Sequence, residues 1–359
     1  MTGPEDEVGR DDEAEDAMTG PAAAAPRRGP LRRLIRVVVV LLVAVGLVGA
    51  GLVTGYEVAS RRAVGSAVPP TIAPSVGAPE PAPSIAPSSP VPTGPTAVLV
   101  GAGDIAACTS ANDEKTAALV AAIPGTVFTT GDNVYQSGTQ AQFRKCYDPS
   151  WGRFRDRTYP AIGNHDAVTL DGQAYFAYFG AAAGPPYEGW YSYQAGTWHV
   201  IVLNSNCATV GGCGEGSHEL TWLKADLAAH PDLCTMAIWH HPRFSSGEHG
   251  DDPMSDPFWQ VLFSAHADLI LNGHDHDYER FAPQTPAGLA DPVDGIREIV
   301  VGTGGKSLRL FHKVAANSEV RNAATYGVLR LDLAPGSYSW QFIATSTGAF
   351  SDSGTTACH

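Results

Sequence analysis

Four short apolar runs in this chain are each followed by a cluster of polar residues, and this recurrence constrains the fold more than any other feature. Runs of this length are typical of buried strands, so the polar residues are expected at the carboxyl ends of strands. Ligands bind at that edge in open α/β sheets. The runs span 97–100, 127–128, 236–238 and 269–271, and the clusters, with a fifth between them, are Gly103-Asp104, Gly131-Asp132-Asn133-Val134-Tyr135, Gly163-Asn164-His165-Asp166, Trp239-His240-His241-Pro242 and Gly273-His274-Asp275-His276.

The clusters carry carboxylates, imidazoles, an amide and a phenol, which are ligands of hard or borderline cations. Taken singly, each residue has an ordinary structural interpretation. Asp104 would suit a helix cap, Asn164 would suit a turn, and Tyr135 would suit a packed aromatic position. Their joint occurrence in this order instead predicts a site for two metal ions, of the kind that hydrolases use.

Composition sets the region before residue 97 apart from the rest. Residues 1–33 are acidic and then basic without apolar periodicity, which predicts a disordered cytoplasmic tail. Residues 34–56 reach the roughly 20 mostly apolar residues that cross a bilayer, and we expect a transmembrane anchor there. A cleaved secretory signal is the alternative, and the protein would then be secreted. Residues 57–96 are rich in Pro, Ala and Ser, which is typical of an extended linker.

The larger group of arginines precedes the apolar stretch, so the positive-inside rule places the N-terminus in the cytoplasm. We therefore expect a single catalytic domain over 97–359, anchored through one N-terminal helix and lying outside the cytoplasm. The net charge of −14 argues against nucleic-acid binding, which requires a basic face. A phosphorylated small molecule remains compatible with this charge, because bound cations reverse the local field.

The segments between the clusters predict an α/β fold with two sheets. A helix is expected over 109–123, with Ser110 or Asn112 as its N-cap, followed by a strand parallel to the one before the helix. A second helix is expected over 217–229, capped by Ser217. Further strands are expected at 191–195, 198–204, 296–302, 326–333 and 338–344, the last two as a hairpin around Pro335-Gly336. This pattern predicts a two-sheet β-sandwich flanked by helices.

All six cysteines lie after residue 97, and an even number outside the cytoplasm predicts three disulfides. Zinc–thiolate binding is disfavoured because no Cys-x-x-Cys pair is present. Six cysteines allow fifteen pairings, and the sequence does not determine the connectivity. Cys207–Cys213, across two glycines, is the pair we expect first. Cys108–Cys146 and Cys234–Cys358 are expected for the rest, with the other pairings of these four left open.

The ordered clusters resemble those of the calcineurin-like metallophosphoesterases and, within them, the purple acid phosphatases, over about residues 97–345. Tyr135, three residues after Asp132, gives the Gly-Asp-x-x-Tyr pattern that distinguishes purple acid phosphatases from most other members. The final motif at 273–280 is also similar to that subgroup. The resemblance implies a four-layer α/β/β/α fold and a metal-dependent phosphoric ester hydrolase of the acid phosphatase kind.

The resemblance also implies two metal positions that share Asp132, with Fe(III) at the first and Fe(II), Zn(II) or Mn(II) at the second. A phenolate with two carboxylates suits a trivalent ion, and two imidazoles with an amide suit a divalent one. A metal-bound hydroxide would then attack the phosphorus of a phosphate monoester. The implied ligands are Asp104, Asp132, Tyr135 and His276 for the first ion and Asp132, Asn164, His240 and His274 for the second.

By the same resemblance, His165 and His249 contact the phosphate and help to protonate the leaving group, and Asp166 is expected to fix the tautomer of His165. His241 lies at a position where the family varies, so we assign it no ligand role. The other histidines are expected to be structural; they are His199, His218, His230, His266, His312 and His359.

Two departures from the family accompany this resemblance. Ala106 stands where the family usually has glycine, and we expect no N-terminal β-domain like that of the large plant enzymes. A phosphodiesterase of the same fold is the alternative within the class, because function depends on the pocket more than on the fold. A catalytically silent cell-surface binding protein is the alternative outside it, although the complete set of ligand residues argues against that.

Overall fold

The first apolar run forms strand β1 (Ala97–Ala102), and the second lies in its parallel neighbour β3 (Thr126–Thr129). The structure is a computed structural model that describes residues 94–231 and 234–359. Strands β1 and β3 belong to a six-stranded sheet in the order β15-β14-β13-β1-β3-β5. The predicted parallel pair and the late hairpin are confirmed. The other strands are β5 (Thr158–Pro160), β13 (Gly327–Ala334), β14 (Ser337–Ala344) and β15 (Ser353–Ala357).

A second sheet has seven strands in the order β12-β10-β11-β9-β8-β7-β6. Its central strands β7, β8, β9 and β11 are parallel, and the pairs at the two edges are antiparallel. The third and fourth apolar runs form β8 and β9. The strands are β6 (Tyr191–Ala195), β7 (Trp198–Val202), β8 (Cys234–Ile238), β9 (Leu269–Asn272), β10 (Tyr278–Phe281), β11 (Arg297–Val301) and β12 (Ser318–Asn322).

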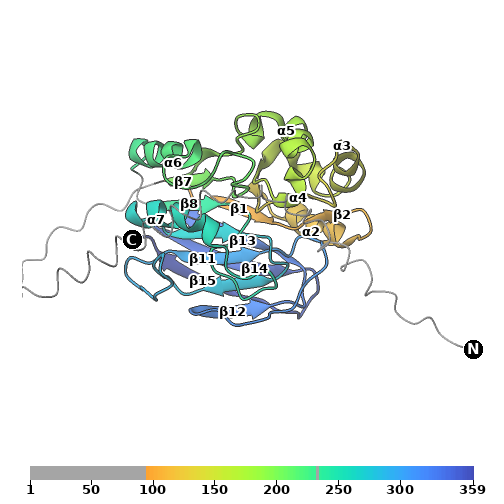
Figure 1. Ribbon diagram of the computed structural model, residues 1–359. Helices are drawn as coiled ribbons and strands as arrows, with labels where there is room; N and C mark the ends of the chain where they lie inside the picture. Colours follow the sequence, from red (N-terminus) through yellow and green to blue (C-terminus); the bar gives the residue numbers. More distant parts are fainter. Residues whose placement is uncertain (1–93, 232–233) are drawn as a thin grey trace, which may run out of the picture. The chain divides into compact units, whose positions relative to one another are not determined.

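Alternation along the strands sorts the apolar side chains of the seven-stranded sheet onto two faces. On β7, Val200 and Val202 enter a core that also contains Leu99 and Val127 of the six-stranded sheet. Ile201, between them, belongs to a second core that two helices complete. Figure 1 shows these helices beside β7 and β8; they are α6 (His218–Ala229) and α7 (Asp256–Ser264).

Helix α2 (Asn112–Ala122) connects β1 to β3 and packs against β13, so helices pack against both sheets as predicted. Its predicted N-cap is wrong: Ala111 occupies that position without a capping side chain. Ser110 lies one residue too early, although its hydroxyl accepts a hydrogen bond from the Asn112 N–H at 3.2 Å. The predicted cap of α6 is confirmed, because the Ser217 hydroxyl accepts from the Leu220 N–H at 3.2 Å.

Short helices and a small two-stranded sheet lie in connections to which the sequence analysis assigned no elements. It also assigned none to α7, β5, β10, β12 and β15. The paired strands are β2 (Ala106–Ala107) and β4 (Val134–Tyr135), which run parallel. The short helices are α3 (Gln140–Gln142), η2 (Phe143–Tyr147), η3 (Trp151–Arg157), α4 (Asn164–Ala167), η4 (Leu170–Gly172), α5 (Gln173–Phe179), η5 (Gly180–Ala183) and η6 (Pro253–Ser255).

The three expected disulfides are all present, and they pair every cysteine of the chain. Cys108–Cys146 ties the segment after β2 to η2. Cys207–Cys213 closes a short loop before α6, and Cys234–Cys358 joins the start of β8 to the end of the chain.

The predicted tail, membrane span and most of the linker lie outside the described residues. Within 94–231 and 234–359, no helix is long and apolar enough to cross a membrane.

Replacing Cys234 and Cys358 together by serine should lower the free energy of unfolding more than the same replacement of Cys207 and Cys213. A bridge restricts the unfolded chain, and the two loops span 124 and 6 residues. Loop-closure entropy then predicts a difference of roughly 2–3 kcal/mol. Denaturant unfolding of the two double variants measures it. Equal losses, or a larger loss from opening the short loop, would contradict the prediction.

Candidate metal centre

The polar clusters meet where strands of both sheets end. Asp104 follows β1, Asp132 follows β3, His240 follows β8 and His274 follows β9. The ring N–H at Nδ1 of His240 donates to the Thr130 carbonyl at 2.8 Å, which ties the end of one sheet to the end of the other. The residues that the sequence predicted as ligands are therefore collected from separate strands of two sheets.

Asp104 and Asp132 occupy matching bends in adjacent parallel strands. Both have left-handed backbones, with φ of 57° and 49°. After the bends, Ala106 and Val134 pair as the strands resume in β2 and β4. Left-handed conformations of non-glycine residues cost about 1–3 kcal/mol and persist where the surrounding structure enforces them. Ala106 is fully buried in this pairing, so the residue that departs from the glycine of the family sits in regular backbone.

A first cluster of side chains, the Asp104 group, contains Asp104, Tyr135 and His276. The Tyr135 hydroxyl donates to Asp104 Oδ1 at 2.7 Å, and His276 Nε2 lies 3.1 Å from that hydroxyl and 3.3 Å from Asp104 Oδ1. His276 Nδ1–H donates to the Ser307 carbonyl at 2.7 Å. In the neutral ring this places the lone pair of Nε2 toward the buried oxygens, which is the tautomer of a metal ligand.

A second cluster, the His240 group, contains Asp132, Asn164, His240 and His274. His240 Nε2 lies 2.9 Å from Asn164 Oδ1 and 3.4 Å from Asp132 Oδ2. Because His240 Nδ1 already donates to a carbonyl, a neutral ring would direct a lone pair at two oxygen acceptors. A proton or a metal ion must therefore lie between these atoms. The rings of His240 and His274 are 5.0 Å apart between centroids.

The charges of the two clusters also favour a cation. Asp104 and Asp132 are 0% and 1% exposed, and single oxygens of both lie within 4.8 Å of each other and of a His240 nitrogen. Burial disfavours the charged ring of His240, yet the Asp132 carboxylate outweighs it and raises the pKa of His240 to about 9. Burial, reinforced by Asp104 and Asp132, raises the pKa of Tyr135 well above its ordinary value. The donor set therefore fits two cations, and a phenolate would require one.

His165 lies beside this centre, but Asp166 does not fix its tautomer as we expected. His165 Nδ1 donates to the Gln136 carbonyl at 2.7 Å instead, and its Nε2 is 3.9 Å from Asp132 Oδ2. Asp166 is fully buried and accepts from the N–H groups of Asn133 and Gly163. Burial, followed by the Asp132 carboxylate, raises the pKa of Asp166 to about 6. Asp166 thus holds together the segments that carry Asp132 and Asn164.

The loop that carries His249 rests on buried carboxylates to which the sequence analysis gave no role. Glu298 accepts from the Arg243 N–H at 3.1 Å, Glu279 from the Ser246 N–H at 2.7 Å and Asp275 from the His249 N–H at 2.8 Å. These contacts bring the His249 ring onto the His274 ring, with centroids 4.1 Å apart and planes 26° apart.

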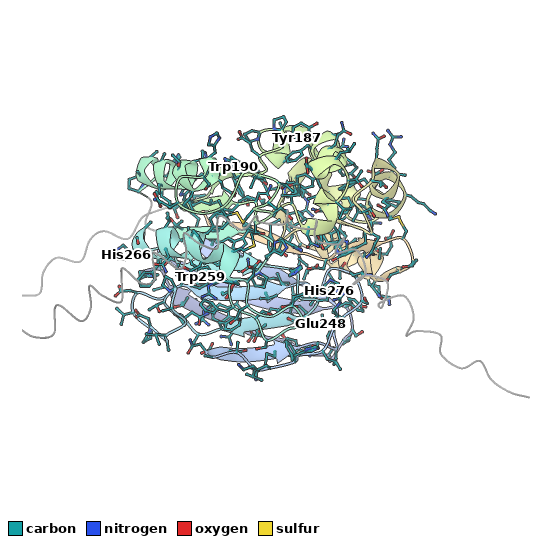
Figure 2. The ribbon with its side chains drawn as sticks, in the orientation of Figure 1. Tyr187, Trp190, Glu248, Trp259, His266 and His276 are labelled. Carbon is teal, nitrogen blue, oxygen red and sulfur yellow. A yellow bond between two sulfur atoms is a disulfide. The ribbon has the colours of Figure 1, made fainter. Side chains whose placement is uncertain are left out.

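Two basic residues at the centre, Lys306 and Arg309, were also missed. Lys306 N–H donates to the Asp104 carbonyl at 2.9 Å, and its ammonium lies 5.1 Å from the centre of the Tyr135 ring. Arg309 N–H donates to the His276 carbonyl at 3.1 Å, and the Arg309 guanidinium contacts Glu248 and His249 at 3.1 Å. Figure 2 labels Glu248 and His276, the residues that Arg309 contacts through its guanidinium and its backbone N–H. The sequence pattern that could have identified these two residues is Gly304-Gly305 after a predicted strand, followed by two basic side chains.

His241, to which we gave no ligand role, lies close to the His240 group. Its ring centroid is 4.5 Å from that of His274, and one of its nitrogens lies within 4.8 Å of nitrogens of His240 and His274. Its Nδ1 is 2.8 Å from the Ser205 hydroxyl. Burial lowers the pKa of His241 to about 3, which keeps the ring neutral. His241 is therefore a neutral imidazole beside the predicted metal ligands, suited to hydrogen bonding with a substrate and not to accepting a proton.

The family model for calcineurin-like phosphoesterases matches residues 98–278, half of the chain. The chain belongs to this family. The match contains all five polar clusters, so the resemblance stated from the motifs is confirmed.

Comparison with individual proteins agrees with the purple acid phosphatase subgroup. An uncharacterized protein of Mycobacterium tuberculosis is 29% identical over 218 residues, which are 49% of this chain and 41% of that protein. Purple acid phosphatase 15 of Arabidopsis thaliana is 28% identical over 199 residues, which are 49% of this chain and 36% of that enzyme. The chain therefore spans only about two fifths of the length of these curated relatives.

The fold is also shared with a solved structure. The purple acid phosphatase from yellow lupin (Lupinus luteus) seeds superposes with a TM-score of 0.59 at 18% identity, covering 73% of this chain and 54% of the lupin chain. This likeness confirms the metallophosphoesterase α/β fold predicted from the sequence.

Replacing Gly163 by alanine should reduce metal binding by displacing the bend that carries Asp132. A Cβ at this position would overlap both a carboxylate oxygen and the backbone nitrogen of Asp132, so the side chain and the backbone of this predicted ligand must shift. Elemental analysis of the purified variant measures the loss, and circular dichroism checks the fold. Gly214→Ala is the matched control, because its Cβ would meet open space. Full metal content in Gly163→Ala would show that Asp132 is not held where the metals bind.

Proposed function

We propose that this chain hydrolyses phosphate monoesters at a binuclear metal centre, as purple acid phosphatases do. The observation that carries the proposal is the pair of buried clusters in which imidazole nitrogens face carboxylate, amide and phenol oxygens. The family supports phosphoesterase chemistry, and the matched acid phosphatases of plants and of the fungus Cryphonectria parasitica support the acid phosphatase assignment.

In this proposal Asp104, Tyr135 and His276 hold the first ion, and Asn164, His240 and His274 hold the second, with Asp132 shared. Fe(III) at the first position is supported by the buried Tyr135, because only a strongly charged cation offsets so unfavourable a phenolate. The neutral amide and two imidazoles suit Fe(II), Zn(II) or Mn(II). The two cations supply Lewis acidity and activate a water molecule as the nucleophile.

The histidines near the clusters would handle the protons. The N–H group at Nδ1 of His165 is committed to the Gln136 carbonyl, which leaves Nε2 on the side of Asp132. His249 is held by Asp275 through its backbone and stacks on His274. His249 Nε2 accepts from the Arg309 guanidinium at 3.1 Å, so Nδ1 is the nitrogen from which this ring would protonate the leaving alkoxide.

Lys306 and Arg309 would orient the phosphate. Both come from one connection, on which their backbones are bonded to Asp104 and His276. Lys306, and Arg309 if it exchanges Glu248 for the substrate, would favour a phosphate monoester, which carries up to two negative charges near neutral pH, over a diester, which carries one. This is the feature of the chain that favours the monoester over the diester alternative.

A paired assay with a chromogenic monoester and the matching diester tests the proposal. We expect a higher kcat/KM for the monoester than for the diester. Arg309→Ala should lower the ratio of these two kcat/KM values more than Lys313→Ala does. Lys313 is exposed on the same connection and serves as the control. A preference for the diester in the metal-loaded wild-type protein would favour the phosphodiesterase alternative. Absence of turnover of either substrate would favour the silent binding protein.

We further propose that the catalytic domain folds outside the cytoplasm, held by the predicted anchor at 34–56 or secreted. Three disulfides support this placement, because such bonds persist in oxidising compartments. Labelling of intact cells with a membrane-impermeant reagent tests it, since a domain exposed outside reacts without lysis. Labelling only after lysis would place the domain inside.

His249→Ala should lower kcat by about 10²–10⁴-fold, the usual contribution of a positioned general acid. Metal content should be unchanged, because His249 is not among the proposed ligands. Rate and elemental analysis are measured on the same preparation, with the exposed His312→Ala as control. A parallel loss of metal would mean that His249 is a ligand and not a proton donor.

Tyr135→Phe should remove the colour of the iron-loaded protein. A phenolate bound to Fe(III) gives a charge-transfer band in the visible range, and phenylalanine has no oxygen to bind. Absorption spectra of the two proteins at equal iron content measure this. A wild-type enzyme that is fully active and colourless with zinc or manganese alone would exclude the Fe(III) assignment while leaving two metals in place.

A further inference from the structure

Three histidine and aspartate side chains that are not among the proposed catalytic ligands collect between α6 and the edge of the seven-stranded sheet. They are His199 on β7 and Asp226 and His230 on or just after α6, and we call them the α6 cluster. One donor atom from each lies within 4.8 Å of the other two. The sequence analysis had given His199 and His230 only a structural role.

The sequence places these residues together through two simple periodicities. His199 and Ile201 are two residues apart on β7, so they share the face that α6 covers. On α6, Leu220 and Leu223 are buried against that face. Asp226 follows Leu223 by three residues, and His230 follows Asp226 by four, so both extend the same stripe of the helix.

The distances between the polar atoms match those between ligands of a small cation. His199 Nε2 lies 2.9 Å from Asp226 Oδ2, and His230 Nδ1 lies 3.3 Å from Asp226 Oδ1. His230 Nδ1 also donates to the Asp226 backbone carbonyl at 2.9 Å, so the half-exposed ring must give up this hydrogen bond to bind a cation. Ligand atoms about 2.0–2.1 Å from a tetrahedral zinc ion are about 3.3 Å from one another. The His199 and Asp226 donors therefore stand near the required separation already.

The hydrogen bonding of His199 is incomplete without such an ion. The residue is 2% exposed; its Nε2 faces Asp226 Oδ2 at 2.9 Å but not in hydrogen-bonding geometry, and its Nδ1 has no hydrogen-bond partner among the described residues. Buried polar atoms without partners are costly and rare. Asp226 Oδ1, by contrast, accepts from the Ser192 hydroxyl at 2.8 Å, which orients the carboxylate as groups around metal ligands do. His230, with 49% of its side chain exposed, gives access from solvent.

We propose that His199, Asp226 and His230 form a second metal site, distinct from the binuclear centre, that binds zinc and fastens α6 to β7. Two neutral imidazoles and one carboxylate are ligands that zinc accepts. The alternative is a metal-free cluster in which the carboxylate is simply paired with the histidines. The proposed zinc site and the metal-free cluster differ in one respect, because only the zinc site binds zinc with a definite stoichiometry.

The test is equilibrium dialysis of the full chain against Zn(II), followed by elemental analysis of wild type, His230→Ala and His218→Ala. His230 is chosen because it is half exposed, so its removal leaves the core intact. His218 is exposed at the other end of α6 and serves as the matched control. We expect His230→Ala to bind one zinc ion fewer per chain than wild type and His218→Ala to bind the same number.

Thermal unfolding with and without zinc provides the second measurement. Zinc should raise the Tm of wild type and of His218→Ala more than that of His230→Ala, because an ion that binds only the folded state stabilises it. Neither substitution lies in the proposed catalytic centre, so zinc bound at that centre contributes equally to the stoichiometry and the Tm shift of all three proteins. Equal stoichiometry and equal Tm shifts in wild type and His230→Ala would overturn the proposal without affecting the phosphatase assignment.

Discussion

Two carboxylates buried side by side, Asp104 and Asp132, impose the constraint on which the rest of the centre depends. Neither is more than 1% exposed, and the bends of adjacent parallel strands hold both in place. Like charges at this separation in a dry site are unfavourable unless cations accompany them. The imidazoles of His240 and His276 face these oxygens with nitrogens whose orientation is fixed by backbone carbonyls. Positive charge is therefore required there, and metal ions meet the requirement with the donor set present.

Much of this could be predicted from the sequence, because the strands obey simple rules. Alternation on β7 separates Val200 and Val202 from Ile201, and the apolar runs mark the strand ends where Asp104, Asp132 and His240 lie. The order of the motifs then singled out the family, which the match over residues 98–278 confirms. The Cys207–Cys213 pair followed from a short loop with two glycines.

The remaining features depend on contacts between residues far apart in the sequence, which no local pattern records. Arg309 reaches His249 across sixty residues, and Glu298 supports the backbone of Arg243 from a separate strand. Asp166 was expected to act on the adjacent His165, but it reaches back to Asn133 instead, and the Gln136 carbonyl takes the imidazole. The N-cap of α2 shifted by one residue because a hydroxyl near a helix start can bond in more than one local turn. Tertiary contacts decided all of these cases except the N-cap, which a local contact decided.

The most direct test of the account is an anomalous-scattering map from crystals of the purified protein, collected at the absorption edges of iron and zinc. The account predicts two peaks about 3.5–4 Å apart on either side of the Asp132 carboxylate, one next to Tyr135 and His276 and the other next to Asn164, His240 and His274. A single peak at this edge, or two peaks that do not share Asp132, would contradict it.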